Sequence, residues 1–249
     1  MLRIDPWALS IIPGAAIPFA WNRSRYYLAP HRYVMEPIVD LHTQEIAGYE
    51  VLYRSHDWLR RFPGSSAEWY WWYRRTMRIL RRSAASIHPL FVTINADTRQ
   101  LLHPGIFPLF QTLRGSQFVL EWTEHGGGDH AEAARRLVRL REENGIRLGI
   151  DDVGSGQDGL LRTTLLRPGG PDLVKLDGDL FQRAVDGDEM AEQHCRIVSG
   201  SVRTLRFTEP RTPPMSLIVE HIETETARRK AIELGAQYGQ GYLWPARYP

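Results

Sequence analysis

Acidic and amide side chains lie at or near the ends of the short apolar runs in this chain. Their carboxylate and amide oxygens are the ligands that Mg²⁺, Mn²⁺ and Ca²⁺ prefer. The single cysteine and the lack of clustered histidines argue against a zinc site. The residues concerned are Glu50, Asn95, Glu121, Asp151, Asp152, Asp177, Glu220 and Gln240, and Lys175 lies on one of the same runs.

Several carboxylates held together need a source of positive charge. Like charges a few Å apart repel, and burial adds a desolvation penalty, so such a group is either partly protonated or occupied by cations. An adjacent pair such as Asp151 and Asp152 can place one carboxylate between two metal ions and the other on only one. Two ions about 3.5 to 4 Å apart are an arrangement that cleaves phosphodiesters. A single strand-end glutamate is usually a cap or salt bridge, so the hypothesis rests on the whole set.

These residues can act together only if the strand ends meet. Eight β-branched or apolar runs predict strands, and helix-like segments lie between most of them. This alternation predicts a parallel sheet with helical crossovers, and in a barrel the carboxyl ends of the strands form the active-site face. The predicted strands are 36–40, 46–52, 90–95, 117–121, 146–151, 172–177, 216–220 and 238–243, and the predicted helices are 68–85, 129–144, 159–166, 178–206 and 225–234.

The first connection differs from the others. Only residues 41–45 separate the first two predicted strands, whereas a parallel crossover needs about a dozen residues or more. These two strands should therefore form an antiparallel hairpin. We predict an α/β fold, a (β/α)8 TIM-like barrel with an antiparallel first strand, over residues 30–249. Residues 1–29 should form an N-terminal extension that either packs against the barrel or regulates it.

Composition limits the class of protein. The chain has 249 residues, a formal net charge of +2 and one cysteine. This charge is too small to imply a nucleic acid or a membrane as partner. The apolar stretch at residues 7–21 is too short, and too interrupted by proline, to span a bilayer. Because one cysteine cannot form an internal disulfide, we expect a cytoplasmic protein.

Two further features receive structural interpretations. Residues 69–73 (WYWWY) precede a run of arginines, a combination that can bind nucleic acid. However, Arg74, Arg78 and Arg82 recur every fourth residue, which indicates a solvated stripe on an outer helix whose aromatic face packs on the barrel. Cys195 lies in a predicted helix without an obvious partner base, so we predict a buried or half-buried thiol rather than a nucleophile.

Seven runs of the sequence resemble the EAL domain, a family of bacterial phosphodiesterases that open cyclic di-GMP to linear pGpG. They occur in family order and cover about residues 30–249. The family fold, a barrel with an antiparallel first strand, agrees with the predicted hairpin. The runs are 36–40 (EPIVD), 48–54 (GYEVLYR), 120–124 (LEWTE), 151–156 (DDVGSG), 174–177 (VKLD), 220–223 (EHIE) and 240–242 (QGY).

The resemblance implies catalysis with two Mg²⁺ or Mn²⁺ ions, by in-line attack of a metal-activated water on one phosphodiester. Lys175 would orient and help to activate this water, Gln240 would hydrogen-bond near it, and Glu50 and Asp152 would also be catalytic. The implied ligands are Glu50, Asn95, Glu121 and Asp151 for one ion, and Asp151, Asp152 and Glu220 for the other.

The resemblance also implies cyclic di-GMP as substrate. Arg54 would hold a substrate phosphate, and Leu52, Asp177 and Glu223 would belong to the substrate site. Glu124 would anchor the loop that follows the Asp-Asp pair. Family members often dimerise through helices near this loop, which keeps a homodimer among the expectations.

The chain departs from the family pattern outside the ligand positions, at Val51, Val153, His221 and residues 157–158. The main alternative is therefore a catalytically weak or inactive EAL-like module that binds cyclic di-GMP or a protein. Such members typically lose metal ligands, which this chain retains. A glycoside hydrolase with two carboxylates is a weaker alternative, because it would not need Lys175.

The basic residues are 29 arginines and only two lysines, Lys175 and Lys230. A lysine on a predicted strand beside Asp177 suggests a place where a compact ammonium is needed and a guanidinium will not serve. Lys230, on a predicted outer helix, needs no special role.

Overall fold

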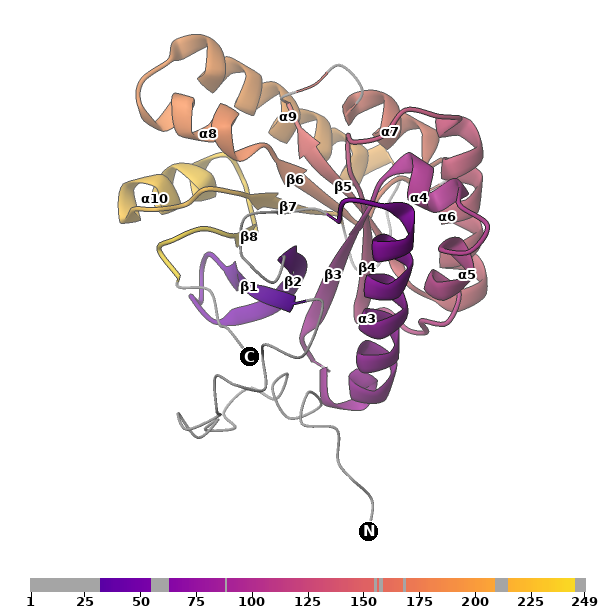
Figure 1. The fold of residues 1–249 in the computed structure, drawn as a ribbon. Helices are drawn as coiled ribbons and strands as arrows, with labels where there is room; N and C mark the ends of the chain where they lie inside the picture. Colours follow the sequence, from indigo (N-terminus) through magenta and orange to yellow (C-terminus); the bar gives the residue numbers. More distant parts are fainter. Residues whose placement is uncertain are drawn as a thin grey trace, which may run out of the picture.

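Eight strands form a closed barrel in sequence order, and helices surround it (Figure 1). The computed structural model describes residues 32–54, 63–87, 89–154, 156, 159–167, 169–208 and 215–244, so the predicted extension at residues 1–29 lies outside the described residues. The predicted barrel is confirmed. Its strands are β1 Arg32–Asp40, β2 Ile46–Arg54, β3 Phe91–Ala96, β4 Phe118–Trp122, β5 Arg147–Val153, β6 Leu173–Leu176, β7 Ser216–Val219 and β8 Tyr238–Gly239.

β1 runs antiparallel to both of its neighbours, β2 and β8, whereas the other adjacent strands are parallel. The hairpin turn begins at Asp40, whose Oδ1 accepts hydrogen bonds from His42 N and Thr43 N, both at 2.9 Å. Gln44 then adopts a left-handed conformation with φ 60°. An aspartate that caps its own turn in this way favours a tight connection. The short connection therefore forms the antiparallel hairpin, as predicted.

The helices cover the outside of the barrel. They are α3 Ser66–Ile87, α4 Thr98–Leu102, α5 Phe107–Phe110, α6 His130–Asn144, α7 Gly159–Leu165, α8 Gly178–Val185, α9 Glu189–Thr208 and α10 Glu225–Glu233. The sequence pattern did not predict α4 and α5, because helices of five and four residues are too short to show a helical period.

The prediction of one continuous helix over residues 178–206 is wrong. α8 ends before Gly187, which adopts φ 95°, a left-handed conformation that glycine tolerates. Asp188 then begins the next helix, since its Oδ1 accepts hydrogen bonds from Met190 N at 3.0 Å and Ala191 N at 3.1 Å. A glycine and a capping aspartate thus interrupt an otherwise continuous apolar pattern.

α3 packs its aromatic face on the barrel, as predicted. Trp72 and Tyr73 are buried, and the Tyr73 ring stacks on that of Trp69 with centroids 5.4 Å apart. The arginines at positions 74, 78 and 82 are exposed. This segment is therefore an outer helix with a solvated basic stripe.

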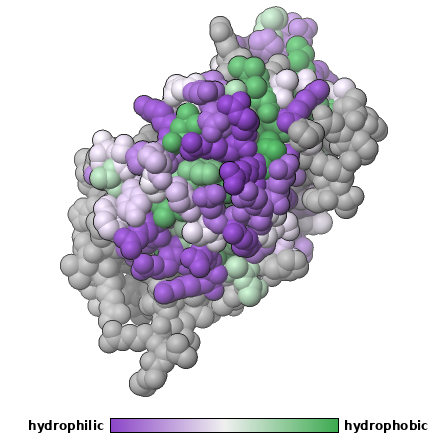
Figure 2. Space-filling model, turned by 90° about the vertical axis from the view of Figure 1, so that its right-hand side faces the viewer, coloured by the Kyte–Doolittle hydropathy of each residue, from purple (hydrophilic) through white to green (hydrophobic). Residues whose placement is uncertain are grey.

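The outer surface is largely hydrophilic on the face that carries α6. Figure 2 shows this face, with hydrophobic side chains in smaller groups among the hydrophilic ones. α6 buries Ala133, Ala134, Leu137 and Leu140 and exposes Arg135 and Arg139 among others, the spacing of an amphipathic helix. None of the described helices combines the length and the apolar character that a bilayer span requires.

Cys195 lies in α9 and is fully buried, as predicted. Burial, which disfavours the thiolate, raises the pKa of this thiol to about 11. The thiol therefore stays protonated at neutral pH and packs as part of the core.

Candidate active site

A buried lysine lies at the centre of the acidic residues that the strand ends bring together. Lys175, on β6, has a side chain only 1% exposed. Four carboxylates on, or directly after, four other strands surround its ammonium group. The distances from Lys175 Nζ are 2.6 Å to Glu220, 3.0 Å to Asp151, 3.2 Å to Glu50 and 3.7 Å to Glu121.

A bulge in β5 aims the adjacent aspartates at this centre. The register with β6 shifts by one residue between Ile150 and Val153. Within this bulge, Asp151 and Asp152 both lie opposite the single residue Lys175. Asp152 has φ 52°, a left-handed conformation that is uncommon without glycine. Since bulges re-aim side chains, two consecutive carboxylates can serve one site instead of pointing to opposite faces of the sheet.

The carboxylates form two overlapping groups that could each hold a metal ion. In each group, one candidate ligand atom per residue lies within 4.8 Å of the others. Asp151 belongs to both groups, as a ligand between two ions would. The groups are Glu50, Glu121 and Asp151, and Asp151, Asp152 and Glu220.

The oxygens of Glu121 show that this site fits a cation. Both are buried and neither accepts a hydrogen bond from the described residues. A buried carboxylate without such partners is costly. A hard divalent cation such as Mg²⁺ or Mn²⁺ would supply the missing interaction through oxygen ligands.

Burial raises the pKa values of most carboxyl groups in the site. Neighbouring carboxylates add to the shift, and Lys175 opposes it. The pKa rises to about 9 for Asp152 and to about 8 for Glu220. Those of Glu121 and Asp151 are raised as well, from the same main cause. The site without metal therefore holds protons that cations would displace.

The charge count agrees with two divalent cations. When all are ionised, the five carboxylates of the two groups and the one lysine carry four net negative charges. Two divalent cations would balance them. In their absence, protonation is the remaining way to reduce repulsion.

Glu50 differs from the other carboxyl groups. Burial would raise its pKa, but the charge of Lys175 and hydrogen bonds to its oxygens lower it below the usual range. Asn95 Nδ2 donates to Glu50 Oε1 at 2.5 Å, and Gln240 Nε2 donates to Glu50 Oε2 at 2.7 Å. Conversely, although burial opposes it, the surrounding carboxylates raise the pKa of Lys175 well above its ordinary value. Lys175 is thus an ammonium and Glu50 a carboxylate.

The two amide side chains keep an oxygen available. The Oδ1 of Asn95 and the Oε1 of Gln240 are buried and accept no hydrogen bond within the part of the chain that the structure describes. An amide that donates its N–H to Glu50 must turn its oxygen elsewhere. These oxygens can therefore bind a metal ion or a water molecule.

The structure places one further acidic residue beside the site. Glu36 pairs with Glu50 in the β1–β2 register, and its Oε2 accepts a hydrogen bond from Gln240 Nε2 at 3.2 Å. Sequence reasoning did not assign it a role. The predicted hairpin could have placed Glu36 at the site, because residues directly opposite each other in an antiparallel pair point to the same face.

The backbone around Asn95 is supported from outside the barrel. The Tyr73 hydroxyl lies 2.6 Å from Asn95 O and 2.8 Å from Gln100 Oε1. Gln100 also forms a capping box with Asp97 at the start of α4, through Asp97 N to Gln100 Oε1 and Gln100 N to Asp97 Oδ1, both at 2.8 Å. The unpredicted α4 therefore helps to fix the end of β3.

The residues predicted to bind substrate do not form a hydrogen-bonded cluster like that of the acidic residues among the described residues. Leu52 lies on β2, two residues after Glu50 and on the same face. The side chain of Arg54 lies outside the described residues. Asp177 caps α8, since its Oδ1 accepts a hydrogen bond from Leu180 N at 2.7 Å. Glu223 is exposed between β7 and α10.

Glu124, the predicted loop anchor, lies beside its neighbour His125, with 2.5 Å between Oε1 and Nδ1. Its charge contributes to the raised pKa of Asp152. Residues 155, 157 and 158 of the loop that Glu124 would anchor lie outside the described residues. The departures from the family pattern at residues 157–158 therefore lie outside them as well.

His221, next to Glu220, has φ 56°. This left-handed conformation explains why glycine suits the position. The imidazole lies against Gly178, where a Cβ atom would be 2.4 Å from His221 Cγ. Its Nδ1 is 3.3 Å from Asp179 Oδ1. The larger side chain is thus accommodated by a glycine at the start of α8.

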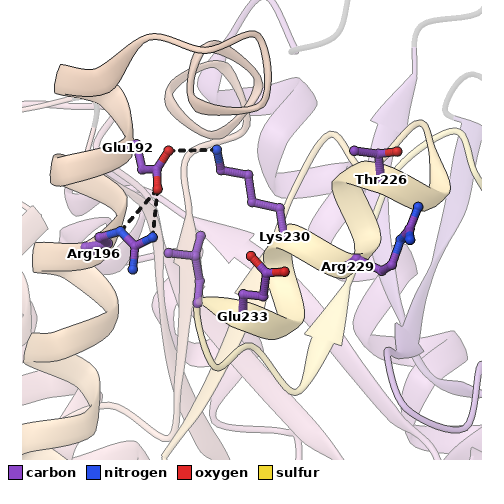
Figure 3. Close-up of a pocket in the computed structure, with 7 residues that line it drawn as sticks. Glu192, Arg196, Thr226, Arg229, Lys230 and Glu233 are labelled. Carbon is purple, nitrogen blue, oxygen red and sulfur yellow. Dashed lines mark hydrogen bonds and ion pairs between the residues drawn. The ribbon is translucent and has the colours of Figure 1, made fainter.

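A separate cavity of about 360 Å³ lies between α9 and α10 (Figure 3). Lys230 of α10 contacts both α8 and α9, since its Nζ donates to Ala184 O at 2.6 Å and to Glu192 Oε2 at 2.9 Å. Arg196 also pairs with Glu192, at 2.7 Å. Lys230 therefore has a structural contact that its position in the sequence did not indicate. The cavity shares no residue with the acidic site.

Comparisons with known proteins point to one family. The EAL domain model matches residues 32–246. Cyclic di-GMP phosphodiesterase PdeA of Borreliella burgdorferi is 30% identical over 167 residues, 65% of this chain and 23% of that protein. Probable cyclic di-GMP phosphodiesterase PdeI of Escherichia coli is 27% identical over 245 residues, 87% of this chain and 29% of that protein. This chain thus spans less than a third of the length of either relative.

A solved structure shows the same fold. Klebsiella pneumoniae BlrP1, in a complex with manganese and cyclic di-GMP, matches with a TM-score of 0.67 and 20% identity, over 88% of this chain and 56% of that one. A second structure of BlrP1 contains calcium and cyclic di-GMP.

Proposed function

Because the chain belongs to the EAL domain family, we propose that it hydrolyses cyclic di-GMP to linear pGpG in a reaction that depends on two Mg²⁺ or Mn²⁺ ions. The observation that carries this proposal is the pair of overlapping carboxylate groups around Lys175. The ligands would be Glu50, Asn95, Glu121 and Asp151 for one ion, and Asp151, Asp152 and Glu220 for the other.

Bound metal would supply the chemistry that these side chains lack, by lowering the pKa of a water molecule and by offsetting charge on the phosphodiester oxygens. The chain positions the reactants. Lys175 would orient the attacking water and help to activate it, and the surrounding carboxylates favour its protonated form. Asn95 and Gln240 hold Glu50 in one orientation through the hydrogen bonds described above.

Substrate recognition is proposed on the resemblance. Arg54 would bind a phosphate, with Leu52, Asp177 and Glu223 in the same site, and Glu124 would anchor the adjoining loop. Asp177 could contribute while its Oδ1 caps α8, because its second oxygen remains for a ligand. We place the activity in the cytoplasm, where a single buried thiol persists without a disulfide partner.

The decisive test is turnover by the purified chain. Cyclic di-GMP is incubated with Mg²⁺ or Mn²⁺, and pGpG is followed by chromatography. Glu50→Ala should abolish turnover, because it removes a ligand and the acceptor of three hydrogen bonds. Glu142→Ala, at an exposed position on α6, is the matched control and should retain activity.

Two outcomes would contradict the proposal. Binding of cyclic di-GMP without turnover under either metal would establish the receptor alternative. Normal activity of Glu50→Ala would refute the ligand assignment. The retained ligand set favours catalysis over the receptor alternative.

A further inference from the structure

α7 contributes a fully buried arginine that contacts the backbone beside the acidic site. Arg162 has 0% exposure and is among the largest fully buried side chains of the described chain. Arginine is rarely buried to this extent, since removing its charge from water is costly. The hydrogen bonds of this side chain should therefore have a specific structural role. The sequence did not indicate it, because one arginine among 29 has no distinguishing pattern.

The guanidinium of Arg162 joins two strand ends. Nη1 donates a hydrogen bond to the carbonyl oxygen of Trp122, and Nη2 donates to that of Asp151 at 3.0 Å. Trp122 ends β4 immediately after Glu121. Asp151 is the carboxylate that both candidate metal groups share. One side chain thus connects the backbones that carry two of the candidate ligands.

The contact to β5 falls on its bulge. The register between β5 and β6 shifts between Ile150 and Val153, so regular ladder pairing does not fix the backbone at Asp151. A donor from α7 to the Asp151 carbonyl holds the backbone there. The Asp152 backbone, with φ 52°, follows directly.

We propose that Arg162 is a positioning residue of the metal site, whose guanidinium fixes the distance between Glu121 on β4 and Asp151 on the β5 bulge. The inference rests on the proposed metal-dependent function. Arg162 would act on the two ligands through the backbone carbonyls of Trp122 and Asp151. Arginine suits this role because its planar fork reaches two acceptors at once, whereas lysine offers a single ammonium group.

The test measures metal binding directly. Arg162→Met keeps an apolar stem of similar length and removes both donors, and Arg162→Lys keeps the charge without the fork. Binding of Mn²⁺ alone is followed by electron paramagnetic resonance, without substrate. We expect Arg162→Met to weaken Mn²⁺ binding about tenfold or more, the range seen when outer partners of metal ligands are lost, and Arg162→Lys to be intermediate.

Asn144→Leu is the matched control. Asn144 Nδ2 also donates to two backbone carbonyls, Gln111 O and Leu113 O, both at 2.9 Å. Asn144 ends α6 shortly before β5, and both carbonyls precede the amino end of β4, whereas Glu121 lies near the carboxyl end of that strand. Asn144→Leu should lower the melting temperature as Arg162→Met does, yet leave the Mn²⁺ affinity within about twofold of wild type. If Arg162 had a purely structural role, its own variants would also lower the melting temperature and leave the Mn²⁺ affinity unchanged.

Turnover provides a second readout. In Arg162→Lys, the Mn²⁺ concentration for half-maximal hydrolysis should rise, while kcat at saturating Mn²⁺ recovers most of the wild-type value. Wild-type Mn²⁺ affinity in folded Arg162→Lys and Arg162→Met would overturn the inference; if Arg162→Met does not fold, Arg162→Lys decides alone. A wild-type chain that binds Mn²⁺ without hydrolysing cyclic di-GMP would refute the proposed function only.

Discussion

Lys175 shows how strongly a single residue depends on its surroundings here. Its ammonium group contacts four carboxylates at 2.6 to 3.7 Å, and they raise its pKa although burial opposes the shift. The fixed positive charge partly offsets their mutual repulsion in a site without metal. The arginine-rich composition already singled out this lysine, and the packing around Nζ gives the physical reason.

Lys175→Arg should lose about a hundredfold or more in kcat, because a guanidinium is wider than an ammonium and would displace the surrounding carboxylates by about 1 Å. Steady-state hydrolysis at saturating Mn²⁺ measures the loss. Lys230→Arg is the matched control, since Lys230 is the other lysine of the chain and shares no contact with the acidic site. Full activity of Lys175→Arg would contradict the role assigned to this residue.

The thiol of Cys195 should be nearly inert in the native protein. Its pKa of about 11 leaves about a hundredfold less thiolate at pH 8 than an ordinary thiol has, and burial blocks access as well. Labelling with Ellman's reagent should therefore be at least about a hundredfold slower in the native than in the urea-unfolded chain. Equal rates would show that the α9 site is open.

At the scale of elements, the contact between the end of β7 and the start of α8 constrains both. His221 occupies a left-handed conformation, and its ring fills the space that Gly178 leaves open. Neither residue can therefore be understood from its own segment. The pair couples the strand end that carries Glu220 to the helix that follows β6.

Gly178→Ala should destabilise the protein by about 1 to 3 kcal/mol, because the new Cβ would lie 2.4 Å from the His221 ring and overpack this contact. In a His221→Gly background the same change should cost about 1 kcal/mol less, since the ring that the new Cβ would meet is gone. Urea denaturation of the four proteins of this double-mutant cycle measures the coupling. An identical cost in both backgrounds would contradict the predicted clash.

At the scale of the whole molecule, closure of the barrel turns dispersed acidic residues into one site. The five carboxylates come from positions 50 to 220 of the chain and meet around one lysine. Folding therefore concentrates negative charge where protons or cations must compensate it. This makes stability, metal binding and pH interdependent.

Rising pH should lower the stability of the metal-free protein, whereas bound metal should raise it. Without metal, Asp152 and Glu220 hold protons up to pKa values of about 9 and about 8, whereas the unfolded chain releases them near 3.8 and 4.5. The native state then binds more protons, so these two groups lower the free energy of unfolding as the pH rises from about 5 to 9. Metal binding needs the ionised carboxylates, so the stabilisation by Mn²⁺ should grow over the same range.

Thermal unfolding with EDTA or with Mn²⁺ tests this prediction. With the Mn²⁺ concentration fixed at 100 times the dissociation constant measured at pH 8.5, Mn²⁺ should add about 2.7 kcal/mol at that pH, or about 5 to 10 °C in melting temperature for a chain of this length, and less at pH 5.5. Equal Mn²⁺ shifts at pH 5.5 and pH 8.5 would contradict the protonation argument. Asn144→Leu should show the wild-type metal shift.

Apolar periodicity and connection lengths were sufficient to predict the barrel and its antiparallel hairpin, because five residues cannot make a parallel crossover. Residue types at the strand ends predicted the acidic cluster, since carboxyl ends of parallel strands share one face. The break between α8 and α9 was missed, because Gly187 and Asp188 interrupt a pattern that continues across them. Arg162 and Glu36 were missed because their partners are distant in the sequence.

The sequence by itself therefore determined which groups could bind metal and which fold would gather them, since both follow from residue type and local spacing. Only the tertiary structure decided how they share charge and hydrogen bonds. The direction of each pKa shift, the bulge at Asp151 and the contacts of Lys175 depend on distances between segments that local sequence does not encode. Interactions of this kind change steeply over an ångström, and packing of the whole barrel sets them.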